Sequence, residues 1–259
     1  MGKIDEVFIK ATDVLTKNPK ILFPFFTFST VMTIVFFSFI IKMWGMLKDL
    51  LFARERIEEI LKTNPNLLEV YGINVNYMIV LSLVFLILAI FVMEMTTSLA
   101  WDALFGKLSL KKSLLLTLRL YLPFSLTFLL LILISIPAFV LAGVFSALFI
   151  PISLILYMFF SILFSLVVAI LLYPLIFYVM PIIVVQRKYF LDALIESYKM
   201  TRKDLKTHLL LGILFVLVSG GVSLVIPVLG SFLSYVLVFP FFTICFCILF
   251  REEEYSSSS

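Results

Sequence analysis

Glu94 is the acidic residue that the sequence places within an apolar segment long enough to cross a membrane. It follows the largely apolar run 77–93 and precedes Thr97, Ser98 and Trp101. If Trp101 marks the membrane interface, the helical rise places Glu94 about 10 Å inside it. Ionisable groups at such depth are costly and usually functional. Glu94, with Thr97 and Ser98, is therefore a candidate proton or cation site. Alternatively, it marks the cytoplasmic end of a short, tilted span, and its carboxylate points to headgroups or pairs with a basic residue.

Motifs for catalysis or cofactor binding are missing from the sequence. There is no H-E-x-x-H pair, no G-x-S-x-G elbow and no P-loop, and His208 is the single histidine. No acidic residues converge within apolar segments as metal-assisted phosphate chemistry requires. Cys245 and Cys247 point about 200° apart on a helix, which disfavours a disulfide and indicates inert packing. We therefore predict no catalytic residue, no metal ligand and no cofactor.

Helix-breaking residues form a second group of candidates. Gly220 and Gly221 could break a span and line a cavity, but small residues also allow close helix packing, which we favour. Pro137 and Pro240 predict kinks within their spans. His208 stands where a span begins and could sense pH. An ordinary interfacial residue is the interpretation we favour for His208.

The segments that must position these residues are long and apolar. Hydrophobic residues make up 63% of the chain and charged residues 14%, the mean hydropathy is +1.20, and residues 122–185 contain no charged residue or histidine. A membrane core about 30 Å thick takes about 20 helical residues. We predict an all-α, polytopic membrane protein forming one domain over residues 1–259. Its six spans are expected at about 21–41, 77–101, 122–145, 152–185, 209–229 and 231–250.

Polar segments with helical apolar stripes separate the spans, at 1–20, 45–63, 106–121 and 186–208. Such helices lie in the membrane interface. The segment 45–63 could receive a partner, but a solvated helix lying on the bilayer is the interpretation we favour. The tail 255–259 is expected to be disordered. The last basic segment supplies the candidate lipid-headgroup contacts, namely Arg187, Lys188, Lys199, Arg202, Lys203 and Lys206.

The positive charges are unevenly distributed, which indicates an orientation. Fifteen of the 20 lysines and arginines fall in 1–20, 94–121, 186–208 and the C-terminus, and the other five fall in 42–76. Basic residues favour the cytoplasmic side. We expect a multi-pass protein of the cell membrane with both termini in the cytoplasm. The spans would form three hairpins, each preceded by a basic amphipathic segment, through repeated architecture or simply through pairwise helix insertion.

The segment 181–203, PIIVVQRKYFLDALIESYKMTRK, carries a resemblance to a known group. A span ending in Pro and Val is followed by a turn, by Ala-Leu-x-x-Ser and by a basic stretch. These positions are Pro181, Val184, Val185, Ala193, Leu194, Ser197, Arg202 and Lys203, and the segment 16–22, TKNPKIL, is also similar. The pattern resembles a broad group of poorly characterised six-helix membrane proteins. That group includes the membrane domain of some glycerophosphodiester phosphodiesterases. The resemblance implies six helices and no activity.

Two hypotheses for function follow from these patterns. The first is a non-catalytic integral membrane protein that binds membrane lipids or a partner membrane protein. The second is a transporter or channel for a small or lipid-like substrate. A polar cavity lined by Glu94 with serines or threonines would favour transport, and a solidly packed centre would favour binding. An enzyme is a weaker third hypothesis. Nucleic acid is not expected as a partner, because the positive charge flanks membrane segments.

Overall fold

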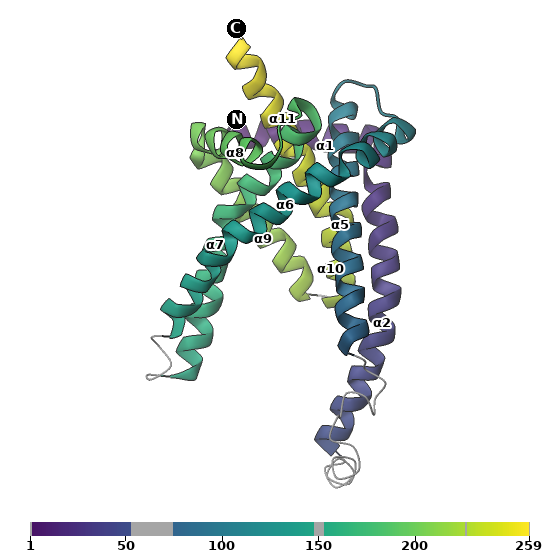
Figure 1. Cartoon of the computed structure of the whole chain (residues 1–259), viewed down its shortest axis with the longest axis vertical. Coiled ribbons are helices and arrows are strands. Elements are labelled where there is room, and N and C mark those ends of the chain that lie inside the picture. Colours follow the sequence, from purple (N-terminus) through teal and green to yellow (C-terminus); the bar gives the residue numbers. More distant parts are fainter. Residues whose placement is uncertain (1, 53–74, 148–152, 226, 259) are drawn as a thin grey trace. The chain divides into compact units, whose positions relative to one another are not determined.

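The structure is a computed structural model that describes residues 2–52, 75–147, 153–225 and 227–258. Each regular element in these ranges is helical (Figure 1). In chain order, the main helices are α1 (Lys3–Lys17), α2 (Phe23–Phe52), α5 (Val75–Leu104), α6 (Leu110–Ala147), α7 (Leu154–Pro181), α8 (Phe190–Lys203), α9 (Leu205–Val225), α10 (Pro227–Leu233) and α11 (Phe239–Ser258). Short helical turns cover Pro19–Leu22, Ile182–Gln186 and Ser234–Val238. The predicted all-α class is confirmed.

Five helical stretches are long and apolar enough to cross a membrane. These are Asn76–Leu104, Leu110–Ala147, Leu154–Gln186, Leu205–Ser223 and Gly230–Glu254. Each of them overlaps one of the six predicted spans. The first predicted span, 21–41, falls in the turn before α2 and in α2 itself. The apolar stretch found there, Pro19–Val35, is shorter than the other five. Six spans therefore remain a prediction.

Two segments that the sequence predicts as separate form one helix. The amphipathic segment 106–121 and the span 122–145 are joined within α6, and Pro123 and Pro137 are both inside this helix. The leucines and lysines of 110–121 are good helix formers, and no glycine separates them from the span. Most of the predicted segment 45–63, and most of the turn between the third and fourth spans, lie outside the described residues.

The basic segment 186–208 contains two helices instead of one. The helix α8 ends at Lys203, Asp204 breaks the backbone, and α9 begins at Leu205. Thr207 donates its backbone N–H to the Asp204 carboxylate at 3.3 Å, as an N-cap requires. Figure 1 shows α8 at one end of α7, against which it packs, whereas α1 packs against α11.

The C-terminal hairpin contains a π-helical turn at Ser234–Val238, which ends two residues before Pro240. Proline has no N–H and excludes the carbonyl four residues earlier, so the wider π turn accommodates it. The helix α11 continues to Ser258, so the disorder expected for residues 255–259 is not found in 255–258. A helix that has already formed in the span extends through these residues at little cost.

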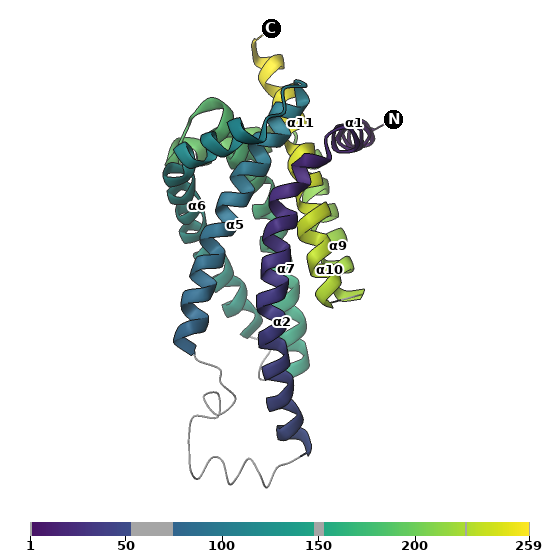
Figure 2. The ribbon, with the colours of Figure 1, turned by 90° about the vertical axis from the view of Figure 1, so that its right-hand side faces the viewer.

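The described chain divides into two compact units. In the unit Phe26–Ala89, the Phe28 and Phe85 rings meet edge to face at 6.3 Å. The other unit combines residues up to Phe25 with Ile90–Ser259 and contains all the sites described below. Figure 2 shows α9 beside α10 in this unit.

Aromatic rings fill the centre of the larger unit. The rings of Phe177 and Phe246 stack at 4.9 Å, and Phe215 packs edge to face on Phe177 and on Phe242. Gly212 lets α9 approach α7, because a Cβ there would lie 3.1 Å from the Ile170 carbonyl oxygen. This tight packing fixes the neighbouring polar side chains.

Candidate functional site

Glu94 is fully buried in α5, with 0% of its surface exposed. Neither carboxylate oxygen has a hydrogen-bond partner among the residues that the structure describes. Arg187 is the charged residue whose field acts on it. The alternative interpretation expected the carboxylate to point to headgroups or to pair with a basic residue. Its burial keeps it from headgroups, and no ion pair of Glu94 is found among the described residues. A buried, unpaired acid is costly, and such groups are commonly kept for function.

Thr97 and Ser98 are buried in the same helix, but the structure does not bring them onto the Glu94 carboxylate. The Thr97 hydroxyl lies 2.8 Å from the Met93 carbonyl oxygen and 3.5 Å from the Met180 sulfur. The candidate site thus reduces to Glu94 itself. Asp102, further along α5, pairs with Lys112 at 3.2 Å.

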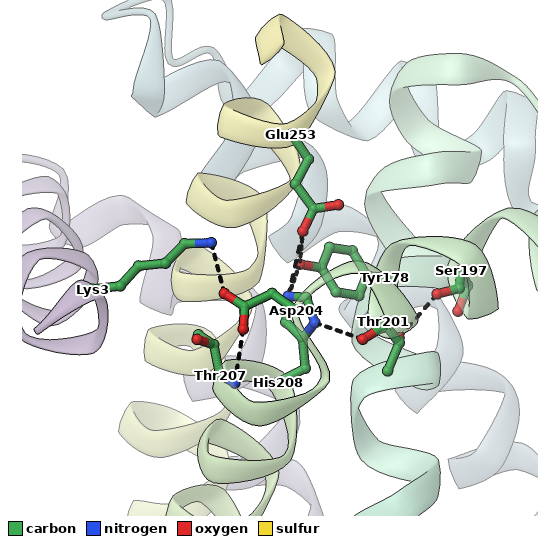
Figure 3. Close-up of polar contacts among 8 residues, drawn as sticks. All are labelled: Lys3, Tyr178, Ser197, Thr201, Asp204, Thr207, His208 and Glu253. Atoms are coloured by element: carbon green, nitrogen blue, oxygen red, sulfur yellow. Dashed lines mark hydrogen bonds and ion pairs between the residues drawn. The ribbon is translucent and has the colours of Figure 1, made fainter. Parts of the chain in front are cut away.

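His208 is the centre of a second buried polar group, shown in Figure 3. Its Nε2 atom lies 2.5 Å from the Tyr178 hydroxyl, and its Nδ1 atom lies 3.0 Å from the Thr201 carbonyl oxygen. Glu253 Oε1 lies 3.5 Å from both Nε2 and the Tyr178 hydroxyl. Because a carbonyl only accepts, Nδ1 carries a proton, and in the neutral ring Nε2 accepts from Tyr178.

This cluster, Tyr178, Thr201, His208 and Glu253, joins four helices. Tyr178 belongs to α7, Thr201 to α8, His208 to α9 and Glu253 to α11. Ser197 adds a link by donating to the Leu175 carbonyl at 2.9 Å, and Thr201 donates to the Ser197 carbonyl at 2.9 Å. Tyr178 and His208 are both 0% exposed. The cluster is almost entirely buried, and its hydrogen bonds link the four helices.

Asp204 attaches the N-terminal helix at the edge of this cluster. Its carboxylate accepts from Lys3 at 2.9 Å and from the backbone N–H of Thr207 (Figure 3). Burial alone would raise the pKa of Asp204, but the hydrogen bonds from Lys3 and Thr207 outweigh it and lower the pKa from 3.8 to about 2. Asp204 is therefore charged at neutral pH, and α1 is tied to the start of α9.

The candidate headgroup residues surround α8. Arg187, Lys199, Arg202, Lys203 and Lys206 are exposed, while Lys188 pairs with Glu196 at 3.1 Å. Leu191, Ile195 and Tyr198 are also exposed on α8, whereas its opposite face buries Ala193 and Met200. Exposed apolar side chains next to basic ones are the pattern of a helix in the membrane interface.

A cleft of about 570 Å³ lies where α1, α11 and the end of α5 meet. Two cations and two anions line it, and Val14, Leu104 and Ile248 give it apolar walls. Lys10 pairs with Glu252 at 2.8 Å across the cleft. Arg251 donates to the Leu104 carbonyl at 3.2 Å and lies over the Phe105 ring at 4.6 Å. Asp13 is the second anion.

The remaining candidates lie apart from these groups. Gly220 and Gly221 are exposed, and a Cβ on either would meet no atom within 4 Å, so the close packing that we favoured occurs instead at Gly212. Pro137 is exposed, and Pro240 is buried next to the π turn. Cys245 and Cys247 are buried free thiols. Within the described ranges, no three His, Cys, Asp or Glu residues gather where they could hold a metal ion.

No family model, no curated protein and no solved structure matches the chain. The resemblance to the six-helix membrane group therefore remains a prediction.

Sequence reasoning singled out Glu94 but missed the partners of His208. Tyr178 lies in the uncharged run and Glu253 in the acidic C-terminal turn, and nothing in their spacing indicates that they meet. The cleft was missed for the same reason, since Lys10 and Glu252 are distant in the chain. Among the polar groups that sequence reasoning missed, the serines of the C-terminal hairpin are the ones whose spacing places them on one helix face. Ser219 and Ser223 are one helical turn apart.

Proposed function

We propose that this chain is a non-catalytic integral membrane protein that binds a zwitterionic phospholipid headgroup. The observation that carries the proposal is the cleft between α1, α11 and the end of α5, which combines both charges with apolar walls. Such a headgroup contains a phosphate and an ammonium group at a short separation. Lys10 and Arg251 suit the phosphate, and Asp13 and Glu252 suit the ammonium.

Two existing ion pairs, Lys10–Glu252 and Asp13–Lys17, do not prevent such binding. The side chains of Lys10 and Glu252 are 54% and 39% exposed, and pairs of this kind contribute about 0–1 kcal/mol. Replacement of one charged partner by another therefore costs little free energy. The acyl chains would follow Val14, Leu104 and Ile248 towards the membrane. The packed aromatic centre of the unit also favours binding over a continuous pathway.

We place both termini in the cytoplasm of a cell-membrane protein with six spans. The support is the distribution of lysine and arginine, together with the two amphipathic helices α1 and α8 at one end of the larger unit. A headgroup cleft beside α1 would then face the inner leaflet.

The test is native mass spectrometry of the chain extracted gently from its own membrane. We expect a retained phosphatidylethanolamine-type adduct. In titrations, Lys10→Ala and Asp13→Ala should each weaken its binding about fivefold, which corresponds to about 1 kcal/mol per contact. Lys112→Ala is the matched control, because Lys112 is also an exposed lysine paired with a carboxylate and lies outside the cleft.

Two outcomes would overturn the headgroup proposal. Equal binding of anionic phosphatidylglycerol would show that the acidic side chains recognise no ammonium group. A retained polypeptide in place of lipid would show that the cleft receives a partner protein.

Transport of a proton or a small cation is a second candidate function. The observation that favours it is Glu94, an acid fully buried in a helix of membrane-spanning length with no hydrogen-bond partner among the described residues. Intramembrane carboxylates of this kind commonly belong to ion pathways.

A further inference from the structure

A second cavity, of about 210 Å³, lies within the membrane-length part of the larger unit. Serine hydroxyls and tyrosines line it together with two phenylalanine rings. The lining residues are Tyr173, Phe215, Ser219, Ser223, Ser231, Ser234, Tyr235 and Phe239. They come from α7, α9, α10, the π turn and the start of α11, and no charged residue is among them. This hydroxyl cavity shares no residue with the headgroup cleft.

The hydroxyl cavity lies deep within the bilayer region. The helical rise puts Ser219 about 20 Å beyond Leu205, where α9 begins, and Tyr173 about 20 Å before Gln186. Both reference residues flank the basic helix α8, which marks the interface. With a hydrocarbon core about 30 Å thick, the hydroxyls lie well inside it. A group of hydroxyls at that depth is a functional-site candidate.

The hairpin is built to hold these serines together. A Cβ on Gly230 would overlap the backbone carbonyl of Val222, so the tight return of the chain requires glycine. The Ser234 hydroxyl lies 3.0 Å from the Ser219 carbonyl oxygen and 3.3 Å from the Ser223 hydroxyl. Ser234 belongs to the π turn, and such turns are frequent at functional sites.

The hydrogen bonds define the chemistry of the ligand. Ser223 and Ser234 give their protons to the Ser219 carbonyl, at 2.8 and 3.0 Å. Their remaining lone pairs are acceptors, so this pair of hydroxyls recognises a ligand group that donates. A bound cation would need an acidic side chain, and a bound anion would need a basic one. Neither is among the residues that line the cavity. A neutral alcohol satisfies this environment.

The route of entry points to a lipid. Tyr235 lines the cavity and is 50% exposed, so the cavity opens on the surface of the unit at bilayer depth. A charged phospholipid headgroup does not reach such depth, whereas an uncharged lipid with a hydroxyl head does. We propose that the hydroxyl cavity binds the free hydroxyl of a neutral lipid of the diacylglycerol class.

The experiment is a native mass spectrometry titration of the purified full chain with 1,2-dioctanoylglycerol and, in parallel, with its 3-O-methyl ether. The ether keeps the shape of the lipid but cannot donate. We expect it to bind about tenfold more weakly, as loss of one buried hydrogen bond predicts. The double variant Ser223→Ala with Ser234→Ala should show the same loss for the alcohol. Ser135→Ala is the matched control, because its hydroxyl bonds within α6 and lies outside the cavity.

Equal binding of alcohol and ether, or undiminished binding by the double serine variant, would overturn the proposal. If that variant fails to fold, Ser223→Leu, which fills the cavity, decides the question by abolishing or sparing the adduct. Lys10→Ala must leave dioctanoylglycerol binding unchanged. The experiments therefore test lipid binding at the headgroup cleft and at the hydroxyl cavity independently.

Discussion

Two buried polar groups in the larger unit differ in how their hydrogen bonds are satisfied. The cluster around His208 pairs its ring with Tyr178 and Thr201 and joins α7, α8, α9 and α11. Glu94 is equally buried, but its two oxygens find no hydrogen-bond donor among the described residues. Burial alone therefore does not distinguish the two groups, whereas the hydrogen bonds that their polar atoms make do. The His208 cluster stabilises the helix bundle. The burial of Glu94 costs free energy that no described hydrogen bond offsets.

The largest expected effect is on the His208 cluster. His208→Ala removes the partner of the Tyr178 hydroxyl and of the Thr201 carbonyl and leaves a void, so we expect a loss of about 3 kcal/mol in the free energy of unfolding. Tyr178→Phe keeps the ring and should cost about 1 kcal/mol. Reversible unfolding in mixed micelles measures both. An unchanged His208→Ala variant would show that the cluster does not hold the helices together.

The close approach of α7 and α9 gives the next effect. Gly212→Ala pushes a Cβ against the Ile170 carbonyl and separates the helices that carry Tyr178 and His208, so we expect about 1–2 kcal/mol of destabilisation in the same micelles. Gly220→Ala is the control, because its Cβ would have no neighbour within 4 Å. If the two variants lose equal stability, helix packing at Gly212 is not what positions the cluster.

Asp204 at the edge of the cluster should respond to pH. Its pKa is lowered from 3.8 to about 2, so its contribution to stability is complete above about pH 4 and is lost as the pH falls through about 2. Asp204→Asn should remove this acid-dependent loss and cost up to about 1 kcal/mol at pH 7 through the lost ion pair with Lys3, because asparagine still caps the helix. Thermal unfolding between pH 7 and pH 2 measures both effects. Asp13→Asn, at an exposed i,i+4 pair, should change stability by less than about 0.5 kcal/mol.

The smallest effect on stability is expected at Glu94. Glu94→Gln breaks no described hydrogen bond, so the free energy of unfolding should stay within about 0.5 kcal/mol of the parent. If Glu94 belongs to an ion pathway, the same variant abolishes proton or cation flux in proteoliposomes. Asp102→Asn, at a carboxylate paired with Lys112, is the control for flux. A loss of about 2 kcal/mol would erase the contrast with His208, and unchanged flux would rule out the transport proposal.

The helical fold followed from the sequence because hydropathy and helix length are local properties. The uncharged run 122–185 requires membrane-length helices whatever else surrounds it. The ends of the helices were harder to predict than their existence, since Pro123 and Pro137 both lie inside α6 and do not end it. Proline is tolerated in apolar helices when neighbouring groups satisfy the freed carbonyls.

The sites were only partly predictable. Glu94 could be found because a charge in an apolar run is visible locally. The Tyr178–His208 pair and the cleft at Lys10 and Glu252 depend on contacts between residues distant in the chain. Such contacts are set by helix packing, which residue spacing along a single chain does not encode.

The docking of α1 has a consequence for how the chain is made. Lys3 pairs with Asp204 and Lys10 with Glu252, so α1 binds residues that the ribosome adds 201 and 242 positions later. Until α9 and α11 have been synthesised, these ion pairs cannot form, and the face of α1 that buries Val7 and Ala11 lacks its main partner, α11. Docking of α1 therefore follows the synthesis of α11, and a chain terminated before α11 leaves that apolar face accessible to quality-control proteases.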